Sequence, residues 1–158
     1  MVAAYRGRVL IESRPALDAE LSALVVAQQR ELCQVGGGLE PRVVRPHDDA
    51  AYLAVLVDGR VVACGAWRPL APGTAEIRRM YVRPAYRGRG IARQLIVALE
   101  EEILATDRSI VRLETGTYLP AAIALYRSAG YLPIPVYGEY VGNPYSVCFE
   151  KRLAVLVQ

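Results

Sequence analysis

The chain has 158 residues, of which 53% are hydrophobic and 22% are charged, and its formal net charge is only +3. That length can form one compact domain with a substantial apolar core, and the composition argues against both a disordered chain and a coiled coil. Acidic and basic residues are mixed along the chain, whereas a nucleic-acid-binding protein more often concentrates positive charge on one face. We therefore expect no nucleic-acid partner.

No apolar run approaches the roughly 20 residues that a membrane span requires, and the first residues lack the pattern of a signal peptide. The three cysteines, Cys33, Cys64 and Cys148, have no Cys-x-x-Cys spacing, and His47 is the sole histidine. These residues are too few, and too poorly spaced, for a tetrahedral zinc site. The sequence therefore predicts a soluble, cytoplasmic protein with reduced cysteines, no metal and no membrane partner.

The first half of the chain contains one helical pattern and several strand patterns. The helical pattern ends at three consecutive glycines, and Asp58-Gly59 between two β-branched runs is a strong hairpin signal. The expected elements are, in chain order, a strand at 9–11, a helix at 18–35, a surface loop at 39–50, hairpin strands at 52–57 and 60–67, and a third antiparallel strand at 74–82.

The second half predicts a loop at 83–90 and then an amphipathic helix at 91–105, in which every fourth residue is apolar. A strand at 110–114, a short helix at 120–128 that begins with proline, and a final strand at 145–153 follow. No internal repeat or linker is present. The order predicts a single α/β domain with a mixed, largely antiparallel sheet, in which a strand–helix–strand unit follows the antiparallel strands.

The segment Arg87-Gly88-Arg89-Gly90 opens directly into the helix at 91–105. Unpaired N–H groups at the positive end of a helix suit phosphate oxygens, and glycines let a ligand approach the backbone closely. A tight turn with solvated arginines also fits this segment. A Walker loop is excluded because no Gly-Lys-Ser/Thr closes it. A dinucleotide fingerprint is disfavoured because Arg93 occupies its third glycine position.

The run Arg87-Gly88-Arg89-Gly90-Ile91-Ala92 resembles the Arg/Gln-x-x-Gly-x-Gly/Ala signature of the GNAT superfamily of acyl-CoA-dependent N-acyltransferases. The order of elements is also similar to that superfamily, as is Leu125-Tyr126-x-x-Ala-Gly-Tyr. The resemblance covers roughly residues 50–152 and implies an N-acetyltransferase with acetyl-CoA as co-substrate. It further implies that the CoA pyrophosphate is held by the loop amides of Arg87, Gly88, Arg89, Gly90, Ile91, Ala92 and Arg93. The backbone of Met80, Tyr81 and Val82 would then pair with the pantetheine arm, although Met80 and Val82 also fit as plain core side chains.

Acetyl transfer requires the acceptor ammonium to lose a proton and the leaving thiolate to gain one. An amine with a pKa of about 10 is neutral in only about one molecule in a thousand at pH 7. The resemblance assigns the base, acting directly or through water, to Glu76, and the acid beside the thioester sulfur to Tyr126. The alternatives are an ion pair of Glu76 with Arg78 on the same strand face, and a core tyrosine with a satisfied hydroxyl.

The acceptor site is expected to involve Arg78, Glu114, Tyr137 and Tyr140. Glu114 ends a strand beside the presumed cofactor cleft, where it fits a second base, a ligand of the amine or a structural carboxylate. Arg78 would meet an acceptor carboxylate. The two tyrosines cluster with Glu139 and Tyr145 in a segment rich in proline and glycine, which lines the pocket or forms a half-buried surface loop.

We expect a small-molecule primary amine to attack the thioester directly, because no cysteine lies in a recognised motif for an acyl-enzyme. One alternative acceptor is a protein N-terminus or lysine, which predicts an open groove in place of a pocket roofed by residues 33–48 and 133–145. A second alternative is a non-catalytic acyl-CoA-binding module, against which the presence of both Glu76 and Tyr126 argues. A homodimer is expected from the resemblance alone.

Overall fold

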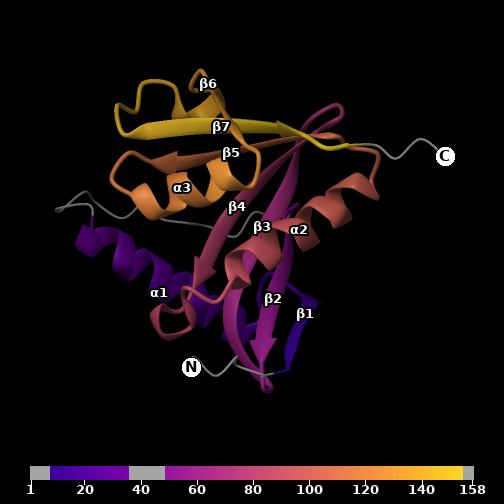
Figure 1. Ribbon diagram of the computed structural model, residues 1–158, viewed down its shortest axis with the longest axis vertical. Helices are drawn as coiled ribbons and strands as arrows, with labels where there is room; N and C mark the ends of the chain where they lie inside the picture. Colours follow the sequence, from indigo (N-terminus) through magenta and orange to yellow (C-terminus); the bar gives the residue numbers. More distant parts are fainter. Residues whose placement is uncertain (1–7, 36–48, 155–158) are drawn as a thin grey trace.

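The computed structural model describes residues 8–35 and 49–154, which form one α/β domain around a seven-stranded sheet (Figure 1). The sheet has the order β1-β2-β3-β4-β5-β7-β6, and only the β4–β5 pair is parallel. The strands are β1 (Val9–Arg14), β2 (Ala51–Val57), β3 (Arg60–Ala71), β4 (Thr74–Val82), β5 (Ile110–Gly116), β6 (Leu132–Ile134) and β7 (Ser146–Arg152). The helices are α1 (Ala19–Val35), α2 (Ile91–Leu104) and α3 (Pro120–Ser128), with short 3-10 helices η1 (Pro84–Tyr86) and η2 (Gly138–Tyr140). The predicted mixed, largely antiparallel fold is confirmed.

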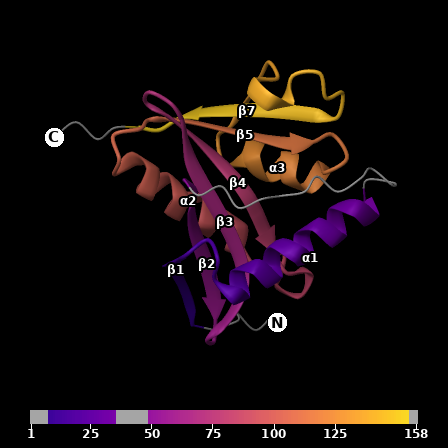
Figure 2. The same ribbon diagram turned by 180° about the vertical axis from the view of Figure 1, so that it is seen from behind.

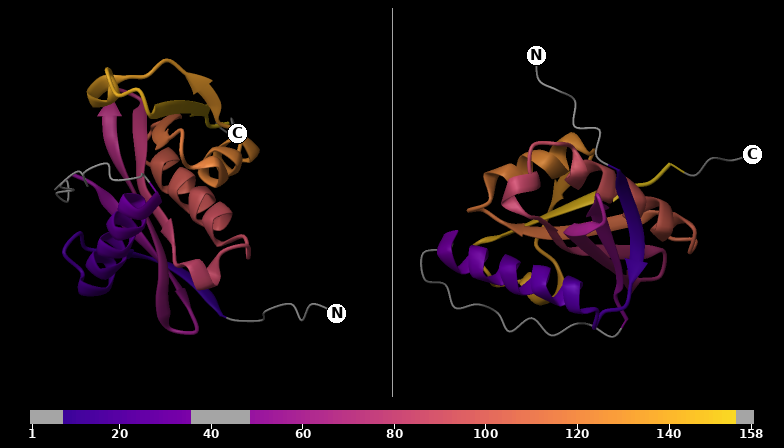
Figure 3. Two further views of the ribbon diagram at one scale, coloured as in Figure 1. Left: turned by 90° about the vertical axis from the view of Figure 1, so that its left-hand side faces the viewer. Right: turned by 90° about the horizontal axis from the view of Figure 1, so that it is seen from below.

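The helices cover opposite faces of the sheet. Helices α2 and α3 lie on the face seen in Figure 1, and α1 crosses the other face, seen in Figure 2. The edge-on views of Figure 3 show the sheet between these two layers. The segment from β6 to β7, which contains η2, lies at the upper end of the molecule in Figure 1, above α3 and β5.

The larger hydrophobic core lies between the sheet and helices α2 and α3. The predicted apolar stripe of α2 is buried in it, at Ile91, Leu95, Leu99 and Ile103. Burial of one large apolar side chain contributes about 1.5–3 kcal/mol, so this stripe fixes α2 on the sheet. A smaller core forms under α1, where Leu21 and Leu24 pack against a group of β2–β4 side chains that includes Tyr52 and Cys64.

The two parallel strands β4 and β5 diverge after a short paired stretch. Only Thr74–Glu76 of β4 pairs with Ile110–Arg112 of β5. Beyond this point β4 continues to Val82 paired with β3 alone, and β5 continues to Gly116 paired with β7 alone. A bulge in β4, where Arg79 has a φ of 56°, accompanies the divergence. Two strand edges that have no strand partner in the part of the chain that the structure describes therefore face each other across the middle of the sheet, as Figure 1 shows.

Candidate functional site

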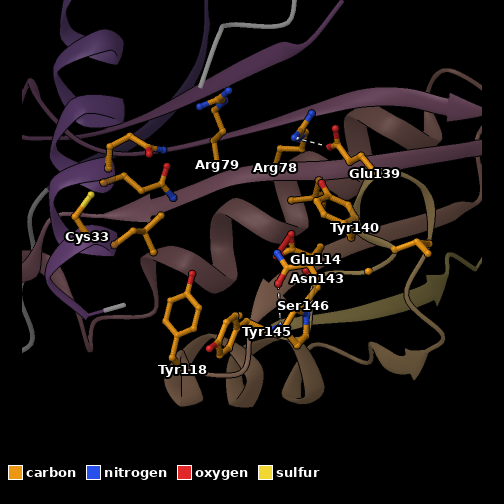
Figure 4. Close-up of a pocket in the computed structure, with 18 residues that line it drawn as sticks. Cys33, Arg78, Arg79, Glu114, Tyr118, Glu139, Tyr140, Asn143, Tyr145 and Ser146 are labelled. Carbon is orange, nitrogen blue, oxygen red and sulfur yellow. Dashed lines mark hydrogen bonds and ion pairs between the residues drawn. The ribbon is translucent and has the colours of Figure 1, made fainter. Parts of the chain in front are cut away.

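A cavity of about 690 Å³ opens where β4 and β5 diverge (Figure 4). Its walls are the C-terminal half of α1, residues 77–79 of β4, the end of β5 and the segment 139–146. Three of the residues predicted for the acceptor site line it, namely Arg78, Glu114 and Tyr140. Its volume is typical of a pocket for a small molecule.

The glycine loop directly follows the unpaired edge of β4. Gly88 and Gly90 have φ values of 76° and 78°, which a residue with a side chain rarely adopts. The first bond of helix α2 runs from the N–H of Gln94 to the carbonyl of Gly90, at 3.1 Å. The N–H groups of Ile91, Ala92 and Arg93 therefore have no carbonyl partner within the helix, and no side chain of residues 8–35 or 49–154 caps this end of it. Amides in this arrangement fit a diphosphate.

The predicted loop arginines have partners within the protein. The Arg87 guanidinium donates to the Val82 carbonyl at 2.8 Å and to Glu31 Oε2 at 2.6 Å, which connects the loop to α1. Arg89 lies over the ring of Tyr86, at 5.2 Å from its centroid. On the next turn, Arg93 donates to Ser128 Oγ at 2.7 Å and so connects α2 to α3. These arginine contacts fix the positions of the segments around the backbone amides at the start of α2.

The segment Met80-Tyr81-Val82 has a backbone edge that is available for pairing, and it also contributes side chains to the core. Tyr81 and Val82 pair with β3, and the opposite edge of this stretch has no strand partner among the described residues. Met80 and Val82 are partly buried against the larger core, as the alternative interpretation expected. The Met80 carbonyl accepts a hydrogen bond from Gln28 Nε2 of α1 at 3.0 Å. An extended ligand could pair with the remaining groups of this edge, by β-augmentation.

Glu76 is completely buried and does not line the cavity. Arg68 Nε donates to its Oε1 at 3.1 Å, and Arg78 Nε lies 3.4 Å from the same oxygen. The Tyr137 hydroxyl donates to its Oε2 at 2.5 Å. The ion pair with Arg78, which we considered as the alternative to a base, is therefore formed, and Tyr137 contacts Glu76 instead of the cavity.

The same network fastens η2 to the sheet. Arg78 Nη2 donates to Glu139 Oε1 at 3.0 Å, and the Tyr137 and Tyr140 rings meet edge to face at 5.5 Å between centroids. The Arg112 guanidinium lies 5.6 Å from the Tyr137 ring centroid. Burial, and then the neighbouring Glu76 carboxylate, raise the pKa of the Tyr137 hydroxyl, which therefore stays protonated as a donor. The charged network thus positions one wall of the cavity.

Replacing Glu76 with glutamine is expected to destabilise the fold by about 3 kcal/mol. The side chains of Arg68 and Arg78 are only 20% and 18% exposed, and both would lose the buried Glu76 carboxylate and keep the half-exposed Glu139. Tyr137→Phe removes one hydrogen bond to a charged group and should cost about 1.5–3 kcal/mol. Urea denaturation measures both values, with Tyr145→Phe as the control because Tyr145 is 48% exposed. An unchanged unfolding midpoint for Glu76→Gln would contradict a stabilising role for the network.

Glu114 and Tyr126 approach the divergence from the two sides of the sheet. Glu114 lies on β5 and lines the cavity, whereas Tyr126 lies on α3, is 7% exposed and belongs to the larger core. Burial, and then the charge of Glu114, raise the pKa of the Tyr126 hydroxyl above its ordinary value of about 10. This hydroxyl makes no hydrogen bond to any residue in the described ranges. It is therefore a protonated donor near the Glu114 carboxylate.

Several cavity residues were not identified from the sequence. They are Gln28, Gln29 and Leu32 of α1, together with Arg79, Tyr118 and Ser146. Cys33, Asn143 and Tyr145 also line the cavity and fall within the segments expected to roof it. The Tyr118 ring packs on Gly116, where an added Cβ would lie 2.5 Å from Tyr118 Cε1. A glycine at the end of a strand signals such a close approach, and this was the one available clue. Residues 36–48, expected as part of the roof, lie outside the described residues.

The described part of the chain contains no cluster of three His, Cys, Asp or Glu side chains that could hold a metal ion. His47 lies outside it. Cys33, Cys64 and Cys148 are free thiols, and burial raises the pKa of Cys64 to about 12. Within residues 8–35 and 49–154, no helix is both long enough and apolar enough to cross a bilayer.

Turnover is expected to continue unchanged in the presence of a metal chelator and a thiol reductant, because no step of the predicted chemistry needs a metal or a disulfide. The protein is first incubated with the reductant, which is then removed. Thiol release during turnover is followed afterwards with a chromogenic reagent. Loss of activity in chelator, with recovery on adding zinc, would reveal a metal site that we have missed.

Comparisons with known proteins agree with this geometry. The model of the acetyltransferase (GNAT) family matches residues 19–131. The chain is 35% identical to the IAA acetyltransferase of Azospirillum brasilense over 138 residues, which cover 87% of this chain and 86% of that protein. It is 40% identical to N-alpha-acetyltransferase RimI of Mycobacterium tuberculosis over 70 residues, or 44% of this chain and 42% of that protein. The crystal structure of a Klebsiella pneumoniae protein assigned as an acyl-CoA N-acyltransferase has a TM-score of 0.80 and 33% identity, covering 92% of this chain and 98% of that chain.

Proposed function

Because the chain belongs to the acetyltransferase (GNAT) family, we propose that it transfers the acetyl group of acetyl-CoA to the primary amine of a small molecule. The chain is an acyl-CoA-dependent N-acetyltransferase. The observation that carries the proposal is the succession of an unpaired β4 edge, a glycine loop with positive φ and the open N-terminus of α2. The edge suits the pantetheine arm, and the amides suit the pyrophosphate. The cavity beyond them receives the amine.

Replacing Gly90 with valine is expected to weaken acetyl-CoA binding at least tenfold. A Cβ at Gly90 meets no protein atom within 4 Å, so the substitution acts through its φ of 78° and through the approaching pyrophosphate. Calorimetric titration with acetyl-CoA measures the affinity.

Gly59→Val is the matched control for this substitution, because Gly59 has a φ of 81°, equally open surroundings, and a position in the β2–β3 hairpin. Both variants should lose similar stability, and only Gly90→Val should lose affinity. Equal affinities in the two folded variants would remove the loop from the binding site.

The proton of the acceptor ammonium goes to Glu114 in our proposal. Glu76 accepts contacts from two arginines and a tyrosine, and it does not line the cavity, whereas Glu114 does. A base must lie within hydrogen-bonding reach of the proton that it removes, or one water away. This favours Glu114 over our sequence-based choice of Glu76 and gives Glu76 a positioning role.

The leaving sulfur also needs a proton, and the donor of that proton lies on the other side of the thioester from Glu114. Glu114 first takes one proton from the acceptor ammonium and releases it to solvent. The neutral amine then attacks the carbonyl carbon, a C–N bond forms, and the C–S bond breaks as a second nitrogen proton passes to Glu114. Tyr126 donates its proton to the departing sulfur and recovers it by exchange through solvent and Glu114. Its lack of a protein hydrogen-bond partner in the described ranges and its raised pKa support a donor role.

The size of the cavity and its wall at 139–146 support a small-molecule acceptor. The similarity to RimI, which is named an N-alpha-acetyltransferase, favours a peptide N-terminus as the second candidate. Thiol release from acetyl-CoA in the presence of small amines, amino acids and short peptides with free N-termini tests both. A small amine with the highest kcat/KM supports our proposal, whereas turnover of peptides alone supports the second.

A further inference from the structure

Ser146 is a buried polar residue that the protein itself leaves unsatisfied. It is only 9% exposed, and its Oγ has no hydrogen-bond partner among the described residues. Most buried side-chain polar atoms in proteins are hydrogen-bonded, and leaving one unpaired costs about 1–3 kcal/mol. Unlike the Tyr131 hydroxyl, which is also unpartnered within residues 8–35 and 49–154 but belongs to the larger core, Ser146 lines the cavity, where a water molecule or a ligand can supply the missing partner.

The position of Ser146 identifies where that partner lies. Ser146 begins β7 opposite Gly116, and Glu114 pairs with Cys148 two residues further along. Ser146 and Glu114 are therefore diagonal neighbours on one face of the sheet, about 7–8 Å apart in the usual geometry. Both line the cavity, and Figure 4 shows them at the same end, together with Asn143.

The backbone around Ser146 holds this end of the cavity in place. The Ser146 N–H donates to the Asn143 carbonyl at 3.2 Å, and the Tyr145 N–H donates to Asn143 Oδ1 at 2.9 Å. The Tyr118 ring closes over Gly116 beside it. The Ser146 hydroxyl can both donate and accept a hydrogen bond, so it suits a ligand group that does the same.

The charges of the cavity favour an uncharged group at this end. Arg78 is paired with Glu76 and Glu139. Figure 4 shows the Arg79 guanidinium directed away from Ser146 and Glu114. A carboxylate placed beside Ser146 would have the Glu114 carboxylate as its charged neighbour on this sheet face. A hydroxyl group avoids that repulsion and satisfies Ser146.

We propose that Ser146 selects the acceptor, and that the preferred acceptor is a short amino alcohol whose nitrogen lies at Glu114 and whose hydroxyl bonds Ser146 Oγ. This assignment rests on the proposed acetyltransferase function and narrows its substrate class.

The test compares isosteric acceptors that differ only in a terminal hydroxyl or methyl group. The pairs are 3-amino-1-propanol with butylamine, 4-amino-1-butanol with pentylamine, and 5-amino-1-pentanol with hexylamine. The wild-type protein should prefer the alcohol of at least one pair by about tenfold or more in kcat/KM, the value of one hydrogen bond in a site built for it. Ser146→Ala should reduce that preference to about one, and Ser146→Thr should keep most of it.

Stability provides a second readout. Because Ser146 Oγ has no protein partner among the described residues, Ser146→Ala should unfold at the same temperature as the wild type or above it. A structural hydroxyl would instead lower that temperature. Ser13→Ala, at an exposed position of β1, is the control for a serine substitution elsewhere in the sheet.

The proposal is overturned if the wild-type protein prefers the alkylamine in every pair, if the alcohol preference survives in Ser146→Ala, or if no pair is turned over while other amines are. In each of these cases turnover of any amine, with retained acetyl-CoA binding, leaves the acetyltransferase function intact. Absence of turnover with every amine and peptide, in contrast, contradicts the proposed function itself.

Discussion

Glu114→Gln is expected to lower kcat/KM by about 10²–10⁴-fold near neutral pH, because glutamine keeps the shape of the side chain but cannot accept the ammonium proton. The loss should shrink as the pH rises toward the pKa of the free amine, about 10, because a growing fraction of the acceptor then arrives already neutral. Initial rates of thiol release across this pH range, at saturating acetyl-CoA, measure the effect.

Glu139→Gln is the matched control, since Glu139 is a second carboxylate that lines the cavity, and it is held by Arg78. Any loss in kcat/KM that it causes through the cavity wall should be the same at every pH, because Glu139 takes no proton from the amine. A loss in Glu114→Gln that stays constant at every pH would mean that Glu114 orients the amine without deprotonating it.

Glu76→Gln distinguishes a general base at Glu114 from a general base at Glu76. Our proposal expects it to act mainly through stability and through the KM of the acceptor, because Glu76 holds Tyr137 and the wall of the cavity. A base at Glu76 would instead give a loss in kcat/KM that recovers at high pH while Glu114→Gln shows none. That outcome would restore the assignment made from the family resemblance.

The local elements could be predicted because their signals are local. The apolar stripe of α2 lies within a single helix, and the Asp58-Gly59 hairpin requires only two residues with positive φ, which both have. Likewise, the glycine loop is contiguous with the helix that it opens, so its conformation follows from its own sequence.

The arrangement of the site could not be predicted, because it depends on contacts across long separations. Glu76 meets Tyr137, 61 residues away, and no pattern in the sequence reports that bond. Ser146 lies opposite Gly116 only because β7, and not β6, is the strand that pairs with β5. The bulge at Arg79 also shifts the register between β3 and the end of β4, so simple alternation along the strand does not decide which side chains reach the cavity.

Tyr126→Phe is expected to lower kcat by about 10–10³-fold and to leave the affinity for acetyl-CoA little changed, since it removes a proton donor needed only as the C–S bond breaks. Tyr131→Phe is the matched control. The Tyr131 ring contacts the Tyr126 ring edge to face at 6.1 Å, and its own hydroxyl is buried without a partner among the described residues. Removing that hydroxyl should leave kcat unchanged and should not reduce stability.

A series of acetyl thioesters distinguishes a proton donor from a packing residue. A thiol of lower pKa departs readily without protonation, so the ratio of wild-type to Tyr126→Phe rates should fall toward one along the series. A packing role predicts the same ratio for every thioester, because a distorted site slows all of them alike. If Tyr126→Phe instead changes only the KM of the acceptor amine, the hydroxyl belongs to the acceptor pocket and the thiolate departs without its help.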